Sequence, residues 1–145
     1  MTTAKGCDLP EDLYYFVEKH IWLRPEGEEV VVMGLTDVAQ HLAGKVIAVT
    51  IKKLGRSLSR GQSAATVESS KWVGPVPTPV SGEIIAVNSH LVADPELLNR
   101  DCYGAGWVVR LRAGSWEEES SGLVTGAAGL DAYQAFLDQE GISCE

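Results

Sequence analysis

The sequence lacks the features of several common functional classes, beginning with positive charge. It contains 12 lysines and arginines against 20 aspartates and glutamates, which gives a formal net charge of −8. Its densest positive cluster, within 52–60, is diluted by turn residues. Because a surface that binds nucleic acid needs a basic face to neutralise phosphates, the charge argues against nucleic acid as a partner.

Cysteine is also scarce. Cys7, Cys102 and Cys144 are odd in number, far apart and without CxxC spacing. This pattern disfavours both a disulfide framework and a structural zinc site. We therefore expect Cys102 to be a small apolar filler or a surface thiol, and Cys144 to lie in a disordered terminus.

Long apolar segments are absent as well. No run approaches the ~20 apolar residues that a membrane-spanning helix needs. Residues 1–12 contain no apolar segment of the kind found in a signal peptide. The sequence therefore predicts a cytoplasmic protein that has no membrane partner.

What the sequence does contain is a series of short β-rich segments. A chain of 145 residues, 45% of them hydrophobic, is long enough to bury the core of one domain. Strands are predicted where β-branched and aromatic residues gather between glycine and proline turns. The predicted strands are 13–17, 20–24, 30–33, 46–51, 63–69, 76–80, 84–87 and 107–111, with a short extended piece around Leu58.

Three short helices complete the pattern. One is capped by Thr36 or Asp37 and ends at Gly44, and another is capped by Asp94 and closes near Asn99. Apolar residues at helical spacing within 130–137 predict the third. The fold class is therefore mainly β, a barrel or sandwich with short peripheral helices and a C-terminal helix. The predicted divisions are an N-terminal extension (1–12), the β domain (13–112), a loop or linker rich in Gly, Ser and Glu (113–129), and the C-terminal helix and tail (130–145).

Two of the predicted strands, 63–69 and 76–80, flank a lone lysine. Lys71 is the only lysine after Lys53 in the sequence. A hairpin of this kind would hold its tip in water, where a modifying enzyme can acylate the amine and turn it into a tether. An unperturbed lysine is mostly protonated at neutral pH, so an activated acyl donor on another enzyme must supply the chemistry.

The segment around Lys71 resembles that of a known family, the H proteins of the glycine cleavage system. Val67-Glu68-Ser69-Ser70-Lys71 is similar to the Val-Glu-Ser-Val-Lys segment that carries lipoate in that family. Further blocks follow in the family's order, and together they span roughly residues 13–137. These blocks are His20-Ile21-Trp22-Leu23, Gly34-Leu35-Thr36-Asp37-Val38-Ala39-Gln40, Pro79-Val80-Ser81-Gly82-Glu83, Asp94-Pro95-Glu96-Leu97-Leu98-Asn99 and Tyr103-Gly104-Ala105-Gly106-Trp107.

The resemblance implies a fold, a cofactor and partners. The fold is a hybrid barrel-sandwich of the lipoyl-domain type, with lipoate attached covalently to Lys71. Glu68, Ser69, Ser70 and Trp72 are then the tip residues that a lipoate ligase, a lipoyl transferase or a partner enzyme recognises. The protein would be a carrier without catalytic residues, and tethering would raise the concentration of its cargo at each partner's site.

Departures from the family's pattern bear on the cargo. The glycine-cleavage branch has Ala-Ala-Ser-Asp after its lysine, where this chain has Trp72-Val73-Gly74-Pro75. Ile21 also replaces the acidic residue that follows the opening histidine. Because an aminomethyl amine is a cation that nearby carboxylates favour, these losses indicate a neutral or sulfur-based cargo.

The tryptophan-bearing hairpin is similar to the H-protein-like lipoate-binding proteins that work with heterodisulfide-reductase-like complexes in bacterial sulfur oxidation. We favour that function over the alternative, an aminomethyl carrier that serves the glycine cleavage enzymes. The other interpretation of Trp72 is simple packing against the barrel.

The sequence disfavours three further interpretations. Biotin domains flank their lysine with methionines, and Ser70 and Trp72 occupy those places here. An unmodified interaction domain on the same fold would not need Lys71 and Glu68. An enzyme could be built from a set of side chains whose spacing matches no motif: His20, Asp37, His41, His90 and Cys102.

Overall fold

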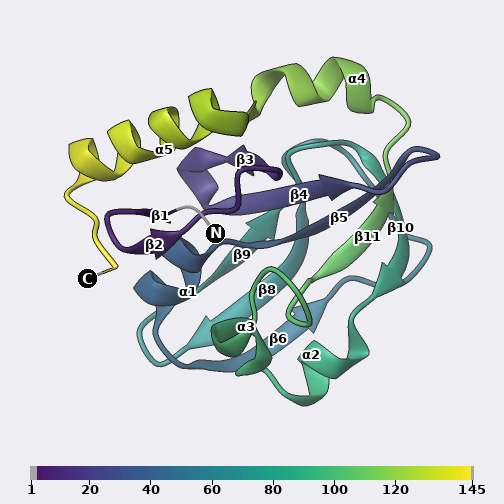
Figure 1. The fold of residues 1–145 in the computed structure, drawn as a ribbon. Helices are drawn as coiled ribbons and strands as arrows, with labels where there is room; N and C mark the ends of the chain where they lie inside the picture. Colours follow the sequence, from purple (N-terminus) through teal and green to yellow (C-terminus); the bar gives the residue numbers. More distant parts are fainter. Residues whose placement is uncertain (1–2, 145) are drawn as a thin grey trace.

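The computed structural model describes residues 3–144, and most of its regular structure is β (Figure 1). All strand pairs are antiparallel, in a seven-stranded sheet, a three-stranded sheet and a small N-terminal hairpin. The large sheet has the order β12 (Val124–Thr125), β3 (Tyr14–Phe16), β4 (Ile21–Pro25), β5 (Val30–Leu35), β11 (Val109–Arg112), β10 (Gly82–Val87) and β7 (Ser57–Leu58). The small sheet has the order β6 (Val46–Ile51), β8 (Ser63–Ser69) and β9 (Val73–Pro77), and β1 (Thr3–Ala4) pairs with β2 (Cys7–Asp8).

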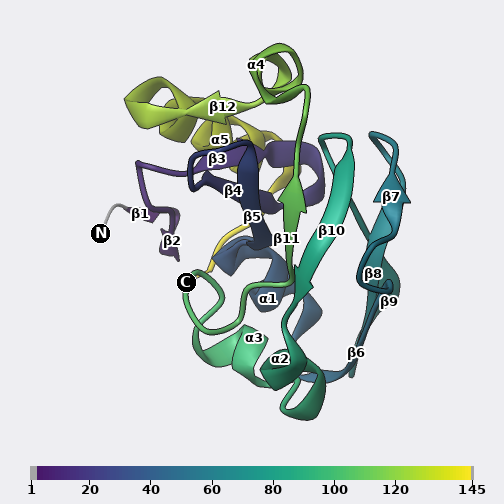
Figure 2. The same cartoon turned by 90° about the vertical axis from the view of Figure 1, so that its right-hand side faces the viewer.

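Short helices connect and cover these sheets. Figure 2 shows the small sheet as a separate layer on one side of the large one, with α5 and the N-terminal hairpin beyond the other side. The helices are the 3₁₀ turn η1 (Val17–Lys19), α1 (Asp37–Ala43), α2 (Ser89–Ala93), α3 (Leu97–Arg100), α4 (Trp116–Glu119), the 3₁₀ turn η2 (Ser120–Gly122) and α5 (Gly126–Glu140). No helix within 3–144 is long and apolar enough to cross a membrane.

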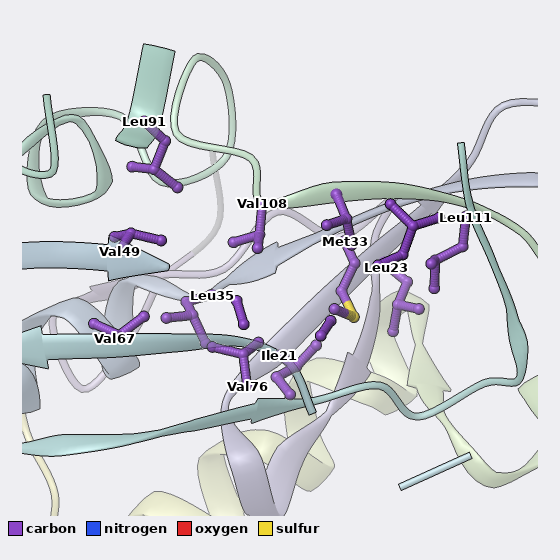
Figure 3. Packing of buried hydrophobic residues seen from close by; sticks show 14 of the residues in the cluster. Ile21, Leu23, Met33, Leu35, Val49, Val67, Val76, Leu91, Val108 and Leu111 are labelled. Atoms are coloured by element: carbon purple, nitrogen blue, oxygen red, sulfur yellow. The ribbon is translucent and has the colours of Figure 1, made fainter. Parts of the chain in front are cut away.

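The main core lies between the two sheets and follows from the alternation of side chains along each strand. Ile21 and Leu23 of β4 are fully buried in this core, together with residues of β6, β8 and β9. Figure 3 shows how side chains of the large sheet, such as Met33, share this core with Val67 and Val76 of the small sheet. The expected mainly β barrel-sandwich is therefore confirmed.

A second core lies on the opposite face of the large sheet. Trp22, between Ile21 and Leu23, points to that face, where it packs in a cluster with Tyr15 and with Tyr133 and Leu137 of α5. The hydroxyl of Tyr15 donates to the carbonyl oxygen of Pro10 at 2.6 Å. This cluster attaches α5 and the N-terminal residues to the barrel.

The predicted helix ends were right for α1; for α3 the end near Asn99 was right and the start at Asp94 was wrong. Thr36 caps α1, because its Oγ1 accepts from the backbone N–H of Ala39, and the helix ends at Gly44 as expected. Asp94 does not begin a helix. It ends α2, a helix that the sequence patterns had not indicated and that Asn88 caps with its side chain. The following helix, α3, has Glu96 at its N-cap.

Two further boundaries differ from the predicted ones. The second arm of the lysine hairpin is β9, which begins at Val73 rather than at residue 76. The segment 113–129 contains α4, η2, β12 and the first turn of α5, so it is more structured than the expected loop or linker. Strand β12 pairs with β3, which fixes this segment to the edge of the large sheet. The division of the chain at residues 12, 112 and 129 stays a prediction.

The prediction against a disulfide is wrong. Cys7 and Cys144 form one across a sequence separation of 137 residues, with their Cα atoms 5.0 Å apart. The residues that follow α5 run back to the N-terminal hairpin, where the N–H of Cys144 donates to the carbonyl of Lys5 at 2.9 Å. Cys144 is therefore ordered and not part of a disordered end. Cys102 is the free cysteine, and it is buried as an apolar filler.

Candidate functional site

Lys71 lies in the four-residue turn 69–72 between β8 and β9, and it is exposed. Its ammonium makes no hydrogen bond or ion pair with any residue of 3–144. The turn itself is held firmly, because the N–H of Ser69 donates to the carbonyl of Trp72 at 2.7 Å. The site is thus an available amine on a fixed backbone.

The side chain of Ser69 shapes the turn from within. Its Oγ accepts from the N–H groups of Lys71 and Trp72 at 3.2 and 3.0 Å, and lies 3.1 Å from the Trp72 carbonyl, to which it donates. Only 6% of Ser69 is exposed. A small hydroxyl residue at this position therefore satisfies backbone groups that would otherwise lack partners inside the turn.

Trp72 both packs and remains accessible. A Cβ added to Gly74 would lie 2.2 Å from Cζ2 of Trp72, so the indole rests directly on this glycine of β9. At the same time 44% of Trp72 is exposed. The two interpretations of this tryptophan, packing and partner recognition, are compatible in this geometry.

The end of α1 supports the turn from the other side. Gly44, at φ +74°, lies against the methylene stem of Lys71, since a Cβ there would be 3.3 Å from Cε. The N–H of Ser70 donates to the carbonyl of Lys45 at 3.0 Å. Asn99 of α3 fixes this region by donating to the Gly44 carbonyl at 2.8 Å and by accepting from the N–H of Val46 at 2.9 Å.

A cavity of about 540 Å³ opens beside Lys71. One wall is apolar and comes mostly from α1 and from the small sheet with its turn, with one residue each from β5 and α3. The other wall comes from η1 and the residue after it, and carries Glu18, Lys19 and His20. The apolar lining residues are Leu35, Ala39, Leu42, Ala43, Val46, Val67, Trp72, Pro75, Pro77 and Leu98.

His20 is the best-anchored polar side chain of the cavity. Its Nδ1 lies 2.5 Å from the hydroxyl of Tyr133, and the two rings are stacked with centroids 5.7 Å apart. Burial lowers the pKa of His20 to about 4, and the negative charge of Glu18 offsets only a small part of this lowering. The imidazole is therefore neutral at neutral pH. Its hydrogen-bonding partner lies on α5.

Sequence reasoning missed Glu18 and Lys19. They precede the recognised block at His20, and no spacing or motif marks them. They reach the cavity because β3 ends in the single 3₁₀ turn η1, which His20 closes in the left-handed conformation at φ 57°. Glu18 supplies a carboxylate to the lining of the cavity that Lys71 also lines, where the departures at Ile21 and Pro75 had suggested that none remained.

The other side chains considered for catalysis do not join this site. His41 and His90 are exposed on α1 and α2. Asp37 accepts from the N–H of Asp8 at 2.8 Å and from Gln40 at 2.7 Å, which makes it a structural residue. Burial raises the pKa of Cys102 to about 12, so its thiol stays protonated. Within 3–144, no three His, Cys, Asp or Glu side chains are grouped as a metal site would require.

The chain is similar to known proteins over nearly its whole length. Residues 13–138 match the family model described as glycine cleavage H-protein. The chain is 43% identical to the probable glycine cleavage system H protein 2 of Sulfurisphaera tokodaii, over 100% of this chain and 99% of that protein. It is 36% identical to glycine cleavage system H protein 2 of Aquifex aeolicus, over 97% and 87%. The crystal structure of a glycine cleavage system H protein from Mycobacterium marinum matches with a TM-score of 0.74 and 31% identity, over 92% of this chain and 100% of that one.

Proposed function

The chain belongs to the glycine cleavage H-protein family, whose members carry a covalently attached lipoate on a lysine, and we propose that Lys71 is that lysine here. The observation that carries this proposal is the exposed, unpaired amine of Lys71 on the rigid turn 69–72. The protein is then a non-catalytic carrier. Its partners are a lipoate ligase or lipoyl transferase and the enzymes between which it moves.

The residues around Lys71 fit a lipoyl group. The group supplies a reversible dithiol and disulfide at the end of a flexible arm. The cavity beside Lys71 offers an apolar wall that can shelter the hydrocarbon part of such an arm from water. Ser69 is buried and would affect modification through the shape of the turn, whereas Glu68, Ser70 and Trp72 are exposed and would be read directly by the modifying enzyme.

For the cargo, we propose the aminomethyl group of glycine cleavage rather than the sulfur cargo that the sequence favoured. The relatives are named as glycine cleavage proteins. Glu18 lines the cavity and supplies the negative charge that a cationic aminomethyl group would favour. The partners are then the glycine cleavage enzymes. A cytoplasmic location stays a prediction, and fractionation of native cells would test it.

A sulfur-based cargo is the second candidate, and one observation favours it. Trp72, Pro75 and Leu42 make the cavity mouth apolar close to the tether. A neutral or sulfur-bound group would sit there without a charge partner. The partner in that case would be a heterodisulfide-reductase-like complex.

Mass spectrometry of peptides from the native protein tests the attachment site. We expect one lipoyl increment on the peptide that contains Lys71 and none in a Lys71→Arg variant. Lys19→Arg is the matched control, because Lys19 is a second exposed lysine on the same cavity. Unmodified Lys71 in the native protein, or modification at Lys19, would contradict the proposal.

The cargo is tested with lipoylated protein and the glycine cleavage enzymes. Aminomethyl transfer should occur, and Glu18→Gln should weaken it by about 2- to 5-fold, since a partly exposed ion pair contributes less than about 1 kcal/mol. Glu140→Gln, at the exposed end of α5, is the control for loss of one surface charge. If no transfer occurs with fully lipoylated protein, the sulfur-based candidate replaces this one.

A further inference from the structure

A buried chain of hydrogen bonds connects the last helix to the cavity wall. Tyr133 of α5 is fully buried, and its hydroxyl lies between Nδ1 of His20 at 2.5 Å and Oγ1 of Thr36 at 3.1 Å. Thr36 is also fully buried, and its Oγ1 accepts from the N–H of Ala39 at 3.3 Å. These four residues come from three separate parts of the chain.

The chain of hydrogen bonds has one consistent direction. The backbone N–H of Ala39 can only donate, so Thr36 Oγ1 uses an acceptor site there. The hydrogen of the Thr36 hydroxyl then needs an acceptor of its own, and the Tyr133 oxygen is the one that lies within reach among residues 3–144. With that oxygen accepting, the Tyr133 hydrogen is free to point at Nδ1 of His20.

The reverse direction is disfavoured by burial. If Nδ1 of His20 carried the proton and donated to Tyr133, the Tyr133 hydrogen would point at Thr36. The Thr36 hydroxyl would then accept twice, and its own hydrogen would be buried without an acceptor, at a cost of about 1–3 kcal/mol. The neutral imidazole therefore holds its proton on Nε2.

Nε2 of His20 faces accessible space. It makes no hydrogen bond to any residue of 3–144, and in this part of the chain no buried side-chain nitrogen or oxygen lacks a partner. Nε2 is consequently not buried. His20 also lines the cavity beside Lys71.

We propose that Tyr133 is a positioning residue that fixes His20 as an Nε2–H donor to a ligand in the cavity beside Lys71. The Nε2–H of His20 would donate a hydrogen bond to the carbonyl oxygen of the amide that joins the lipoyl arm to Lys71. This inference rests on the proposed function, because that carbonyl is the one strong acceptor of a lipoyl-lysine arm, whose sulfurs accept only weakly.

The tautomer is tested by nitrogen-15 NMR of the histidine rings in unlipoylated protein. We expect the Nε2–H tautomer for His20 in the wild type. Tyr133→Phe keeps the stacked ring but removes the donor to Nδ1, so the tautomers should mix and the pKa of His20 should rise. Tyr15→Phe is the matched control, since it removes another buried hydroxyl from the same cluster without touching His20.

Thr36 provides an independent check on the direction. Thr36→Ser keeps the hydroxyl and should preserve the wild-type tautomer, and Thr36→Val should preserve it too, because Nδ1 of His20 is then the one acceptor among residues 3–144 within reach of the Tyr133 hydrogen. An Nδ1–H tautomer in the wild type, or an unchanged tautomer in Tyr133→Phe, would overturn the assignment. Melting temperatures of all variants, compared with that of Tyr15→Phe, show whether each is folded.

Lipoylated protein tests the acceptor. Exchange of the His20 Nε2–H with solvent should slow by about 2- to 10-fold on lipoylation, as one net hydrogen bond of 0.5–1.5 kcal/mol implies, and this slowing should be lost in Tyr133→Phe. If lipoylated protein shows no slowing, the arm does not use this donor. If Lys71 is never lipoylated, the proposed function fails while the tautomer result stands.

Discussion

Reducing the Cys7–Cys144 disulfide should destabilise the protein markedly. The bond closes a loop across 137 positions. In the chain-entropy treatment, closing a loop of that length lowers the entropy of the unfolded chain and so stabilises the fold by about 5 kcal/mol. The stability measured to be lost when a disulfide is removed is usually about 2–4 kcal/mol. The nearby Lys5–Asp138 ion pair would contribute little to holding the C-terminal tail, because about half of each side chain is exposed.

The expected effect on melting follows from the size of the domain. At about 3 °C for each kcal/mol, a loss of 2–4 kcal/mol lowers Tm by about 6–12 °C. The measurement is a thermal melt with and without reductant, followed by circular dichroism. A Cys7→Ser, Cys144→Ser double variant should melt at the reduced protein's temperature and should not respond to reductant.

Thiol counting provides a check that does not depend on stability. The sequence has three cysteines, of which two are in the disulfide, so the denatured but unreduced protein should react with one maleimide at Cys102 and the reduced protein with three. The thiols should be blocked with the alkylating reagent before the cells are lysed, so that no disulfide forms or exchanges during purification. Three reactive thiols before reduction, or a Tm shift below about 1 °C, would refute the reasoning.

Two further predictions concern the hairpin tip and the cavity wall. Gly74→Ala should lower the free energy of unfolding in urea by about 1–3 kcal/mol, because its Cβ would clash with Trp72. This loss should largely vanish in a Trp72→Ala background. Gly114→Ala is the control and should be nearly neutral, since a Cβ there would have nothing nearer than 3.8 Å. Stability should fall as pH drops from about 6.5 towards 4, because the unfolded chain binds a proton that folded His20 resists. A Tm-against-pH curve that is equally steep in His20→Gln would rule out this contribution.

Sequence patterns predicted the elements whose cause is local. The β-branched and aromatic residues within 20–24 identify a strand, and Thr36 with Gly44 marks both ends of a helix. The lone lysine between two strand-like segments located the turn of the candidate site. In each case the deciding interaction lies within a few residues of the signal.

What the sequence did not indicate depends on distant parts of the chain. Odd, widely spaced cysteines gave no hint of a disulfide, because Cys7 and Cys144 meet only after α5 has returned the chain to the N-terminal hairpin. Glu18 reaches the cavity through the left-handed backbone at His20, which no residue preference marks. Tyr133 was recognised as an apolar helix position, yet its hydroxyl serves a residue 113 positions away.

The two sides of the cavity are built on different supports. The turn 69–72 belongs to the small sheet and rests on Gly44 and Asn99, whereas the wall with His20 follows η1 and is supported from behind by α5. On the proposed function, recognition of Lys71 by a modifying enzyme would depend on the first support, and sheltering of the arm would depend on the second. Changes in α5 would then alter how the arm is sheltered without changing whether it is attached.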